Sequence, residues 1–592
     1  MLKQPDSSSI FDAPPAESTT LDVIPLGGVE EIGLNCTAFV YGQDVIVVDA
    51  GLKFPESTHL PGVDLVVPDF TFLKESSLRL RGLILTHGHE DHIGALAFFL
   101  QTVEGPLTVY GTALTLAMAM GRLEEYDVVA PKTQEIKPRD KLSLGPFDVE
   151  FIGVNHSILA GVGLAISTPV GVVIHTGDFK IDYCAPEAEQ TDLYSFARYG
   201  EQGVLALLSD STNADVPGFC KSEVEVGAAL TDIFQKAPGR IILACFSSSL
   251  ARIRQVALAA KVSDRKILFD GRSMRETVSL GHLHNFLDID VRDYVTMEEA
   301  ADYDDRSLAI VVTGSQGEPL SALSRMALGE HKFLSVQKGD TVIFSARVIP
   351  GNERAISAVI NQFYSKGAIV VDNRLQSVHA SGHGQAEELK LMLSLTKPKH
   401  LIPIHGEPRQ LAAHASLARL TGMADNQIKI LSNGQRLMFG HDGSASLGQR
   451  VPTGRMLVDG NRLGQSGDPV IRGRLKMAEQ GLVYVVIVLD PQSFEPVAPI
   501  AVKMAGVLFE NDSDLVEAAH RTTAKCLKDW KLQAGGHVPQ VENLLEALKR
   551  ELRSLFKHSI RSRPIICPEV LFMKQDGSLT NCADDSNGEI SG

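Results

Sequence analysis

The sequence predicts an α/β protein that has a layered core, a middle block of alternating strands and helices, and a small α+β unit near the C-terminus. Three observations support this prediction. Short apolar runs of strand length recur and end at polar residues, as buried strands do. Residues 219–375 alternate between strand-like and helix-like segments, which indicates a mostly parallel sheet flanked by helices. The 592 residues are too many for one core and suggest about three or four domains.

The composition is that of an ordinary globular protein. Hydrophobic residues make up 44% of the chain and charged residues 22%, which excludes a disordered or fibrous protein. The 56 Lys and Arg residues against 72 Asp and Glu residues give a net charge of −16. This charge is only a weak argument against nucleic acid as a partner, because an enzyme that holds one strand in a channel needs local positive charge.

The sequence predicts a cytoplasmic location. The best apolar candidate for a membrane helix, 481–489, has only the length of a buried strand, so we expect no membrane association. The first residues lack a basic start followed by an apolar stretch, so we expect no secretory signal. Seven scattered cysteines without a CxxC pattern favour a reducing compartment over a disulfide framework.

The first block of elements follows a tail, residues 1–18, which is rich in Ser, Pro and Asp and is predicted to be disordered. Apolar runs that end at polar residues predict strands within 44–51, 81–88, 171–178 and 203–210. Residues 95–100 and 114–122 are predicted helices between them. Together these elements make a layered α/β or αββα arrangement.

The second block differs because strands and helices alternate along it. Its predicted strands are 241–247, 266–271, 307–315 and 340–345, and its predicted helices are 222–235 and 250–262. Around His379 the polar-ended strands of the first block return, at 399–407.

A smaller unit ends the chain. A Gly-rich passage at 440–467 is a predicted connector, and a strand at 481–489 then begins the unit. Amphipathic helices are predicted near 513–533 and 540–556. The residues from Asp576 onward carry acids and no base and are predicted to be disordered.

The stretch Thr86–Leu96 carries the most informative motif. His87, His89, Asp91 and His92 form the pattern H-x-H-x-D-H directly after an apolar strand. Imidazole and carboxylate groups are ligands of Zn²⁺, and four of them in six positions are too many for one catalytic zinc that keeps an open site. They suit two metals instead. With 18 histidines in 592 residues, a chance cluster in a solvated loop is the poorer interpretation.

Two metals need further ligands, and later strand ends offer them. His156, Asp178 and His405 each follow an apolar run. Taken singly, each of these residues is more often a capping or core residue than a ligand. Together with the first motif, they indicate a shared metal site at the ends of the strands.

These motifs resemble those of the metallo-β-lactamase superfamily and, more closely, those of ribonuclease J, a family of β-CASP nucleases that act on RNA. The resembling stretches are 25–35, 48–56, 86–96, 175–180, 207–219, 312–325, 379–393 and 397–407. They cover nearly the whole chain apart from both tails. The motifs LSDSTN and SGHG are much more specific than HxHxDH.

The resemblance implies an αββα metallo-β-lactamase core with an inserted β-CASP α/β domain and a small α+β C-terminal domain. The implied parts are a disordered tail (1–18), the first part of the core (19–218), the β-CASP domain (219–375), the second part of the core (376–447), a linker (448–475), the C-terminal domain (476–575) and a disordered tail (576–592).

The resemblance also implies a metal site with two zinc ions per chain, for which Mn²⁺ or Mg²⁺ could substitute. One zinc would bind His87, His89 and His156, and the other would bind Asp91, His92 and His405, with Asp178 as the bridging ligand. Some family members bind a further divalent ion, often assigned as calcium, and the matching positions are Asp49, Gly51 and Asp459. Oxygen ligands of this kind suit a hard cation. The alternative for Asp459 is a turn aspartate before Gly460.

Catalytic and substrate-binding residues follow from the same resemblance. Asp210 and His383 are implied as the pair that handles the proton of the leaving 3′-oxygen, with the donor and acceptor roles within the pair left open. The substrate phosphate would contact His379, Ala380, Ser381, Gly382 and His383. Arg272 and Arg325 are candidates for RNA phosphate contacts, including a 5′-monophosphate pocket, although surface arginines are usually only solvated.

The implied function is that of a zinc-dependent ribonuclease in rRNA maturation and mRNA decay. It would combine 5′→3′ exonuclease activity on single-stranded RNA with 5′-monophosphate ends and endonuclease activity. A homodimer or homotetramer and membership of an RNA-degradation complex are further expectations.

Alternatives from other classes remain. A β-CASP nuclease acting on DNA typically lacks a histidine at the position of His405, and a non-catalytic RNA-binding partner subunit would have lost some ligands. A thioesterase of the same superfamily needs no insertion, and a diiron flavoprotein typically has Glu in place of His89.

Overall fold

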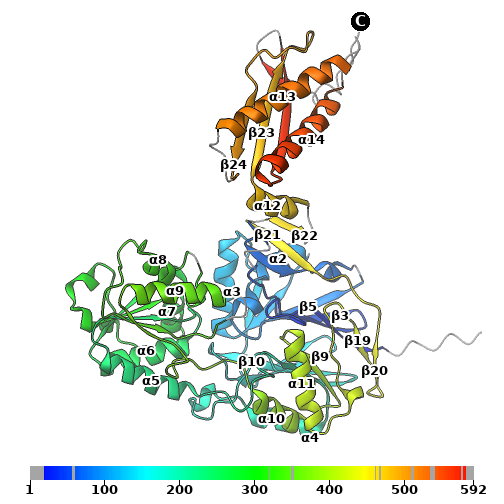
Figure 1. Ribbon diagram of the computed structural model, residues 1–592. Helices are drawn as coiled ribbons and strands as arrows, with labels where there is room; N and C mark the ends of the chain where they lie inside the picture. The colour runs from blue at the N-terminus through cyan, green and yellow to red at the C-terminus, as the bar shows by residue number, and fades with distance from the viewer. Residues whose placement is uncertain are drawn as a thin grey trace, which may run out of the picture. The chain divides into compact units, whose positions relative to one another are not determined.

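The computed structural model describes residues 19–55, 60–75, 77–103, 105–318, 320–348, 352–460, 462–465, 469–507, 513–533, 540–574 and 578–581. The chain divides into two compact units (Figure 1). The first unit consists of Met1–Phe54 and Leu65–Leu463, and the second of Pro55–Asp64 and Gly464–Gly592. The predicted tail at 1–18 lies outside the described residues.

The first unit contains two sheets that form its core. The first sheet has the strand order β20-β19-β1-β2-β3-β5-β6-β7. Its strands are β1 (Leu21–Gly27), β2 (Cys36–Tyr41), β3 (Asp44–Val48), β5 (Arg79–Ile84), β6 (Thr108–Gly111), β7 (Lys132–Glu135), β19 (Leu437–Phe439) and β20 (Ala445–Leu447). Strands β3, β5, β6 and β7 are parallel to one another, and the others pair antiparallel.

The second sheet has the strand order β18-β12-β11-β10-β9-β8. Its strands are β8 (Lys141–Leu144), β9 (Phe147–Val154), β10 (Gly161–Thr168), β11 (Gly171–His175), β12 (Val204–Asp210) and β18 (His400–Ile404). β11, β12 and β18 are parallel neighbours, so their C-terminal ends lie at one edge of the sheet.

Helices cover the outer face of each sheet. The core helices are α1 (Glu90–Ile93), α2 (Leu96–Thr102), α3 (Ala113–Glu125), α4 (Leu193–Gln202), α10 (Ala386–Thr396) and α11 (Pro408–Leu420). Along β3, Val45 and Val47 pack with α2 and α3, whereas Ile46 and Val48 pack against the second sheet. On the second sheet, Leu207 packs with α4 and α10. The predicted αββα layers are therefore confirmed.

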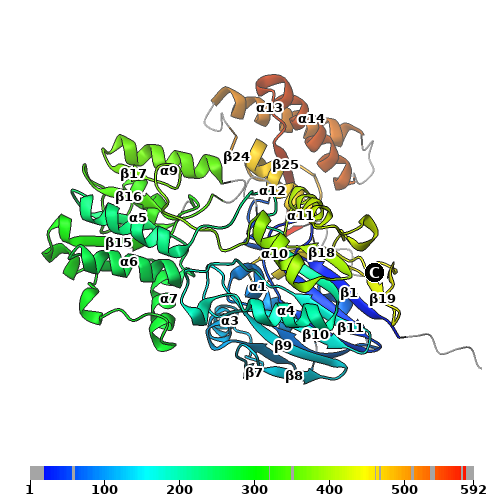
Figure 2. The same ribbon diagram turned by 90° about the horizontal axis from the view of Figure 1, so that it is seen from below.

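Residues between β12 and β18 form a third, separate sheet of the first unit (Figure 2). Its order is β14-β15-β13-β16-β17, and every pair is parallel. The strands are β13 (Ile241–Ala244), β14 (Lys266–Asp270), β15 (Leu308–Val312), β16 (Thr341–Phe344) and β17 (Ile369–Val371). The helices α5 (Glu223–Lys236), α6 (Leu250–Val262) and α7 (Arg272–Leu283) cover one face, and α8 (Ala322–Leu328) and α9 (Glu353–Ser365) cover the other. The predicted parallel sheet flanked by helices is confirmed.

The passage predicted as a linker differs in part from a plain connector. Arg455–Asp459 forms strand β21, which pairs antiparallel with β4 (Leu65–Pro68) and is followed by β22 (Arg462–Gln465). Val458 is fully buried in the same apolar cluster as the first sheet, which explains why this segment is held against the core.

The second unit has one four-stranded sheet with the order β24-β23-β25-β26. Its elements are α12 (Pro469–Gln480), β23 (Leu482–Leu489), β24 (Ala501–Ala505), α13 (Ser513–Gln533), α14 (Val541–Ile560), β25 (Ile565–Met573) and β26 (Leu579–Asn581). Alternate residues of β23 pack against α13 and α14. The stretch from Asp576 onward that was predicted to be disordered contains β26, which extends the sheet by pairing antiparallel with β25. Residues 582–592 lie outside the described residues.

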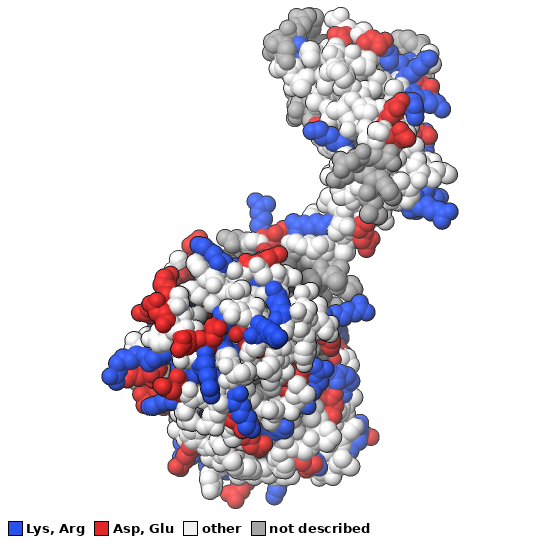
Figure 3. All heavy atoms as spheres, turned by 60° about the vertical axis from the view of Figure 1, so that its left-hand side comes forward, with Lys and Arg blue, Asp and Glu red and all other residues white. Residues whose placement is uncertain are grey.

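None of the helices that the structure describes is both long enough and apolar enough to cross a membrane. Figure 3 shows Lys and Arg side chains interspersed with Asp and Glu side chains on the face that it presents.

Candidate metal centre

Strand ends bring ligand-type residues of distant sequence together at one edge of the core. Asp178 follows β11, Asp210 is the last residue of β12, and His405 follows β18. These three strands are parallel neighbours, so the three residues meet. His156 follows β9, which runs in the same direction as β11. The HGHEDH loop follows β5 of the other sheet and continues into α1.

The first cluster consists of three histidines. His89 Nδ1 lies 3.2 Å from His87 Nε2 and 3.1 Å from His156 Nε2. Burial lowers the pKa of His87 and His156 well below its ordinary value and the pKa of His89 to about 4, so each ring is neutral at pH 7. His156 Nδ1 donates to the carbonyl of Gly382 at 2.6 Å, which leaves its Nε2 lone pair free for a metal.

The second cluster consists of Asp91, His92, Asp178 and His405. His92 Nε2 lies 3.2 Å from Asp178 Oδ2, and His405 Nε2 lies 3.2 Å from Asp91 Oδ2. The same Asp178 oxygen is 3.7 Å from His87 Nε2 and 3.8 Å from His156 Nε2. Asp178 therefore lies between the two clusters.

The charges of the second cluster depend on one another. Although burial opposes it, His405 and His92 lower the pKa of Asp178 well below its ordinary value. Burial by itself would lower the pKa of His405, but the carboxylates of Asp178 and Asp91 outweigh it and raise this pKa to about 10. Without a cation, the buried carboxylates thus hold protons on the neighbouring imidazoles.

Two buried atoms indicate that these residues fit a metal. Asp178 Oδ2 and His405 Nε2 are buried and have ion-pair contacts at 3.2 Å or longer, but no hydrogen bond of good geometry among the described residues. An unsatisfied buried polar atom costs about 1–3 kcal/mol, and a bound cation satisfies both a carboxylate oxygen and an imidazole lone pair. His405 also has a positive φ of 52°, a backbone strain that persists mainly at functional sites.

Asp49 supports His92 from behind the second cluster. Its Oδ1 accepts from the Thr86 N–H at 2.8 Å, and its Oδ2 accepts from Thr86 Oγ1 at 2.9 Å and from His92 Nδ1 at 2.7 Å. These contacts use both carboxylate oxygens of Asp49 and direct His92 Nε2 toward Asp178.

Two carboxylates, Asp49 and Asp459, and the backbone of Gly51 are the predicted calcium ligands. A Cβ at Gly51 would lie 1.6 Å from the carbonyl oxygen of Asp91, so only glycine fits there. Asp459 is exposed at the end of β21. In the part of the chain that the structure describes, no group of three or more ligand-type side chains includes Asp49 or Asp459. The calcium site stays a prediction.

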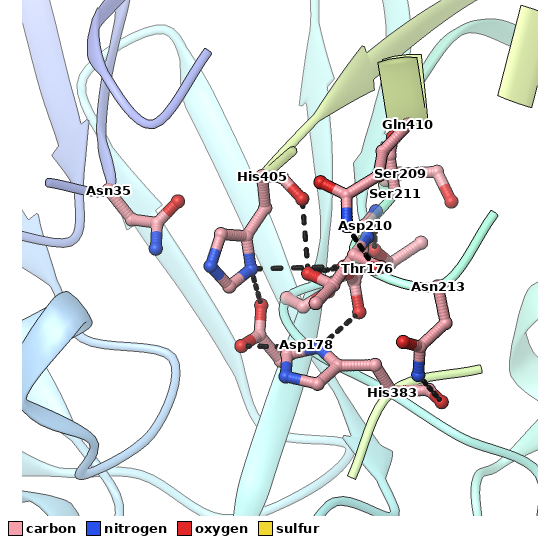
Figure 4. Close-up of polar contacts among 12 residues, drawn as sticks. Asn35, Thr176, Asp178, Ser209, Asp210, Ser211, Asn213, His383, His405 and Gln410 are labelled. Carbon is pink, nitrogen blue, oxygen red and sulfur yellow. Dashed lines mark hydrogen bonds and ion pairs between the residues drawn. The ribbon is translucent and has the colours of Figure 1, made fainter. Parts of the chain in front are cut away.

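Asp210 and His383 are in direct contact beside the metal clusters (Figure 4). His383 Nδ1 lies 2.8 Å from Asp210 Oδ2. The other oxygen of Asp210 accepts from the N–H and the hydroxyl of Thr212 at 2.9 Å and 2.8 Å. Asp210 is buried, whereas the His383 side chain keeps 21% of its surface exposed. A buried carboxylate thus orients a partly exposed imidazole, the arrangement that acid–base catalysis requires.

The predicted phosphate-binding segment runs from His379 to His383, between β17 and α10. A Cβ at Gly382 would lie 2.6 Å from His156 Cε1 and 2.7 Å from Ser157 Oγ, so the glycine lets the chain pass close to the first cluster. Ala380 is buried. Burial lowers the pKa of His379 to about 3, so this ring is uncharged at pH 7.

Asn213 has a role in the site that sequence reasoning did not assign. Its Nδ2 donates to Ser381 Oγ at 2.8 Å and to the His383 carbonyl at 2.9 Å. The only signal in the sequence is that Asn213 belongs to the same LSDSTN motif as Asp210. Of the two candidate arginines, Arg272 forms ion pairs with Glu125 and Glu276, and Arg325 is exposed on α8.

Family models match four parts of the chain. The model described as "Metallo-beta-lactamase superfamily" matches residues 31–208, and "Ribonuclease J, beta-CASP domain" matches 238–363. "Zn-dependent metallo-hydrolase RNA specificity domain" matches 369–430, and "Ribonuclease J C-terminal domain" matches 469–572.

Curated relatives match over most of their length. Ribonuclease J of Synechocystis sp. is 38% identical over 563 residues, which cover 94% of this chain and 87% of the relative. Ribonuclease J 1 of Streptococcus pyogenes is 37% identical and covers 93% of this chain and 97% of its own. Ribonuclease J2 of Bacillus subtilis is 35% identical, covering 93% and 98%.

Among the solved structures that share the fold is a protein of unknown function from Enterococcus faecalis, with a TM-score of 0.51 and 15% identity. The match covers 71% of this chain and 100% of that chain.

Proposed function

This chain belongs to the ribonuclease J family and is a metal-dependent ribonuclease. From this premise we propose that it uses two zinc ions and acts in rRNA maturation and mRNA decay. We propose that it is both a 5′→3′ exonuclease on RNA with 5′-monophosphate ends and an endonuclease. The observation that supports the proposal best is the central place of Asp178 Oδ2, within 3.8 Å of nitrogens from both clusters and from His383.

Each metal would have three ligands of its own and one that both metals share. His87, His89 and His156 would hold one zinc, and Asp91, His92 and His405 would hold the other, with Asp178 shared between them. When bound, such a pair lowers the pKa of water to about 7 and neutralises charge on a phosphate oxygen. Mn²⁺ or Mg²⁺ could replace zinc, because carboxylate ligands also suit these ions.

The protein's own acid–base group is His383. Asp210 accepts the Nδ1 proton of His383, which fixes the orientation of the ring. When it is protonated at Nε2, His383 can give a proton to the 3′-oxygen that leaves when the P–O3′ bond breaks. Thr212 and Asn213 hold Asp210 and the His383 backbone in place, so that the pair meets the substrate in one orientation.

The phosphate at the cleavage point would lie on the segment from His379 to His383. Ser381 offers a hydroxyl, and Gly382 leaves the backbone open to a close approach. The preference for a 5′-monophosphate would come from the inserted domain, whose connections to the core, near 218–222 and 372–380, adjoin this segment. A pocket for the terminal phosphate at a fixed distance from the metals would set both the direction and the length of the product.

A β-CASP nuclease that acts on DNA is the alternative. The match to the RNA specificity model and the imidazole of His405 in the second cluster favour RNA. Homodimer or homotetramer formation, membership of an RNA-degradation complex and the cytoplasmic location stay predictions from the sequence.

One experiment tests the proposal as a whole. The purified protein is analysed for metal and incubated with one sequence as 5′-monophosphorylated RNA, 5′-triphosphorylated RNA and single-stranded DNA, with products mapped at both ends. We expect about two zinc ions per chain and mononucleotides released from the monophosphorylated RNA. Preferred cleavage of DNA, or full activity of protein stripped of all divalent metal ions, would refute it.

A further inference from the structure

Two residues that follow β16 link the inserted domain to the stretch from Val378 to His383, which contains the predicted phosphate-binding segment, one of them directly and the other through Asn213. Ser345 and Arg347 come directly after this strand, which lies at the centre of the inserted sheet. The segment that they approach, Val378–His383, is the one by which the chain returns to the core.

The first contact is a buried anchor. The Val378 carbonyl accepts from Ser345 Oγ at 2.7 Å and from Arg252 Nη1 at 2.7 Å. Arg252 is 2% exposed and also pairs with Glu223 at 2.9 Å. Because these groups are buried and mutually paired, this contact holds the start of the segment whether or not RNA is present.

The second contact reaches His383 through a single amide group. Arg347 Nη1 donates to Asn213 Oδ1, while Asn213 Nδ2 donates to Ser381 Oγ and to the His383 carbonyl. Figure 4 shows the Asn213 amide directed at His383. Asn213 itself is 1% exposed, whereas Arg347 is an exposed residue.

The direction of the Asn213 amide depends on Arg347. An amide carries its acceptor and its two donors at opposite ends, and a half-turn exchanges them. A guanidinium has donors only, so it can bind the oxygen end of the amide but not the nitrogen end. With Arg347 in place, both amide hydrogens must face Ser381 and the His383 carbonyl.

We propose that Arg347 is a positioning residue for RNA hydrolysis: it fixes the orientation of the Asn213 amide and so holds His383 against Asp210. This inference rests on the proposed role of His383 in proton transfer. The inserted domain is then part of the catalytic geometry, because a movement of the end of β16 would reorient the Asn213 side-chain amide that binds the His383 carbonyl.

The size of the effect follows from the role of His383. Its ring is held by Asp210 at 2.8 Å and its backbone by Asn213 at 2.9 Å. A displacement of about 1 Å in a catalytic group can cost about 100-fold in rate. Loss of Arg347 should therefore reduce kcat by about 10- to 100-fold, with little change in KM, because the amide contacts the enzyme and not the substrate.

The test compares Arg347→Ala, Arg347→Lys, Asn213→Ala and the double variant Arg347→Ala/Asn213→Ala. Arg292→Ala is the matched control, because it removes the same charge from an exposed residue of the same domain. Among the described residues, the Arg292 side chain forms hydrogen bonds and ion pairs only with Asp290. The readouts are kcat, KM, metal content and melting temperature of the full chain on one 5′-monophosphorylated RNA.

We expect Arg347→Ala to lose kcat, Arg347→Lys to recover most of it because an ammonium also donates to Oδ1, and Arg292→Ala to behave as the parent. The double variant should be no slower than Asn213→Ala, since both changes break one chain of contacts. If Asn213→Ala does not fold, the lysine rescue decides alone.

Two results would overturn the inference. One is a raised KM with unchanged kcat in Arg347→Ala, which would make Arg347 an RNA-binding residue, and the other is a loss no larger than that of Arg292→Ala. The proposed function fails separately, if His383→Ala itself retains full turnover.

Discussion

His383 Nδ1 lies 2.8 Å from Asp210 Oδ2, although 173 residues and a whole inserted domain separate the two in the sequence. The same nitrogen lies 3.8 Å from Asp178 Oδ2, the oxygen shared by both metal clusters. Under the proposed function, His383 transfers a proton and does not hold either metal, although it also belongs to a group of ligand-type residues with Asp178, Asp210 and His405.

This separation of roles predicts the behaviour of His383→Ala. Metal content should stay at the parent value while RNA cleavage falls by about 10²- to 10⁴-fold, the range for loss of an acid–base group. Metal analysis and single-turnover rates on the same preparation check both halves. Loss of one metal per chain would show instead that His383 is a ligand.

His87→Ala should show the opposite pattern. His87 Nε2 faces the first cluster, so its removal should abolish hydrolysis and lower the zinc content. The chain should still fold, because the αββα core does not depend on this ring. Circular dichroism, zinc analysis and activity are compared with the parent, and near-normal zinc occupancy with normal turnover would exclude His87 from the site.

Asp49 and Asp459 distinguish orientation of a zinc ligand from calcium binding. Because Asp49 holds His92 Nδ1 at 2.7 Å, Asp49→Ala should weaken metal affinity by about 10- to 100-fold. Asp459→Ala should leave zinc affinity unchanged. Titration of both variants with zinc and with calcium checks this, and an equal loss of calcium in both variants would favour the calcium site.

His414 predicts a pH dependence of stability. It is fully buried on α11, where its Nδ1 contacts Ser211 Oγ at 3.0 Å. Burial lowers the pKa of His414 from 6.5 to about 4. Between these values the unfolded chain binds a proton that the folded chain does not, so the free energy of unfolding falls as the pH drops from about 6.5 to about 4, by at most about 3 kcal/mol.

The variant His414→Gln should lose this part of the pH dependence. Urea unfolding of parent and variant at pH 7 and at pH 5 gives the comparison. The difference between the two pH values should be smaller in the variant. An equal pH dependence in both proteins would mean that His414 is protonated in the folded state.

The 5′ end of the RNA should decide the rate of the exonuclease mode. A 5′-triphosphate carries more charge and bulk than a monophosphate pocket accepts, so it should slow removal of mononucleotides and leave internal cleavage intact. Because phosphate contacts dominate the binding, the rate should also fall steeply with salt. A time course on one 5′-labelled RNA in both forms is the measurement; equal rates, or shortening from the 3′ end, would contradict the pocket.

Much of the fold and of the metal centre is predictable because each ligand ends an apolar run. Asp178 and His405 follow strands whose hydrophobic pattern is plain in the sequence, and parallel pairing then brings them together. Strand β21 could not be predicted from the sequence, because its burial depends on pairing with β4, almost 400 residues earlier.

Contacts between ordinary polar residues could not be predicted from the sequence either. Arg347 and Asn213 are 134 residues apart and neither type marks a site by itself, so only the folded chain reveals their contact. The same holds for Asp49, whose oxygens are used by Thr86 and His92.

The position of β18 has a consequence for the order in which the enzyme becomes active during synthesis. β18 pairs with β12, yet the whole inserted domain is translated between these two strands. A ribosome-bound chain in which His87, His89 and His156 have already been synthesised still lacks His383 and His405. Such a nascent chain can assemble one half of the metal site but has no means to complete the other, so a ribonuclease made on an RNA template gains its cutting activity only after most of the template has been read.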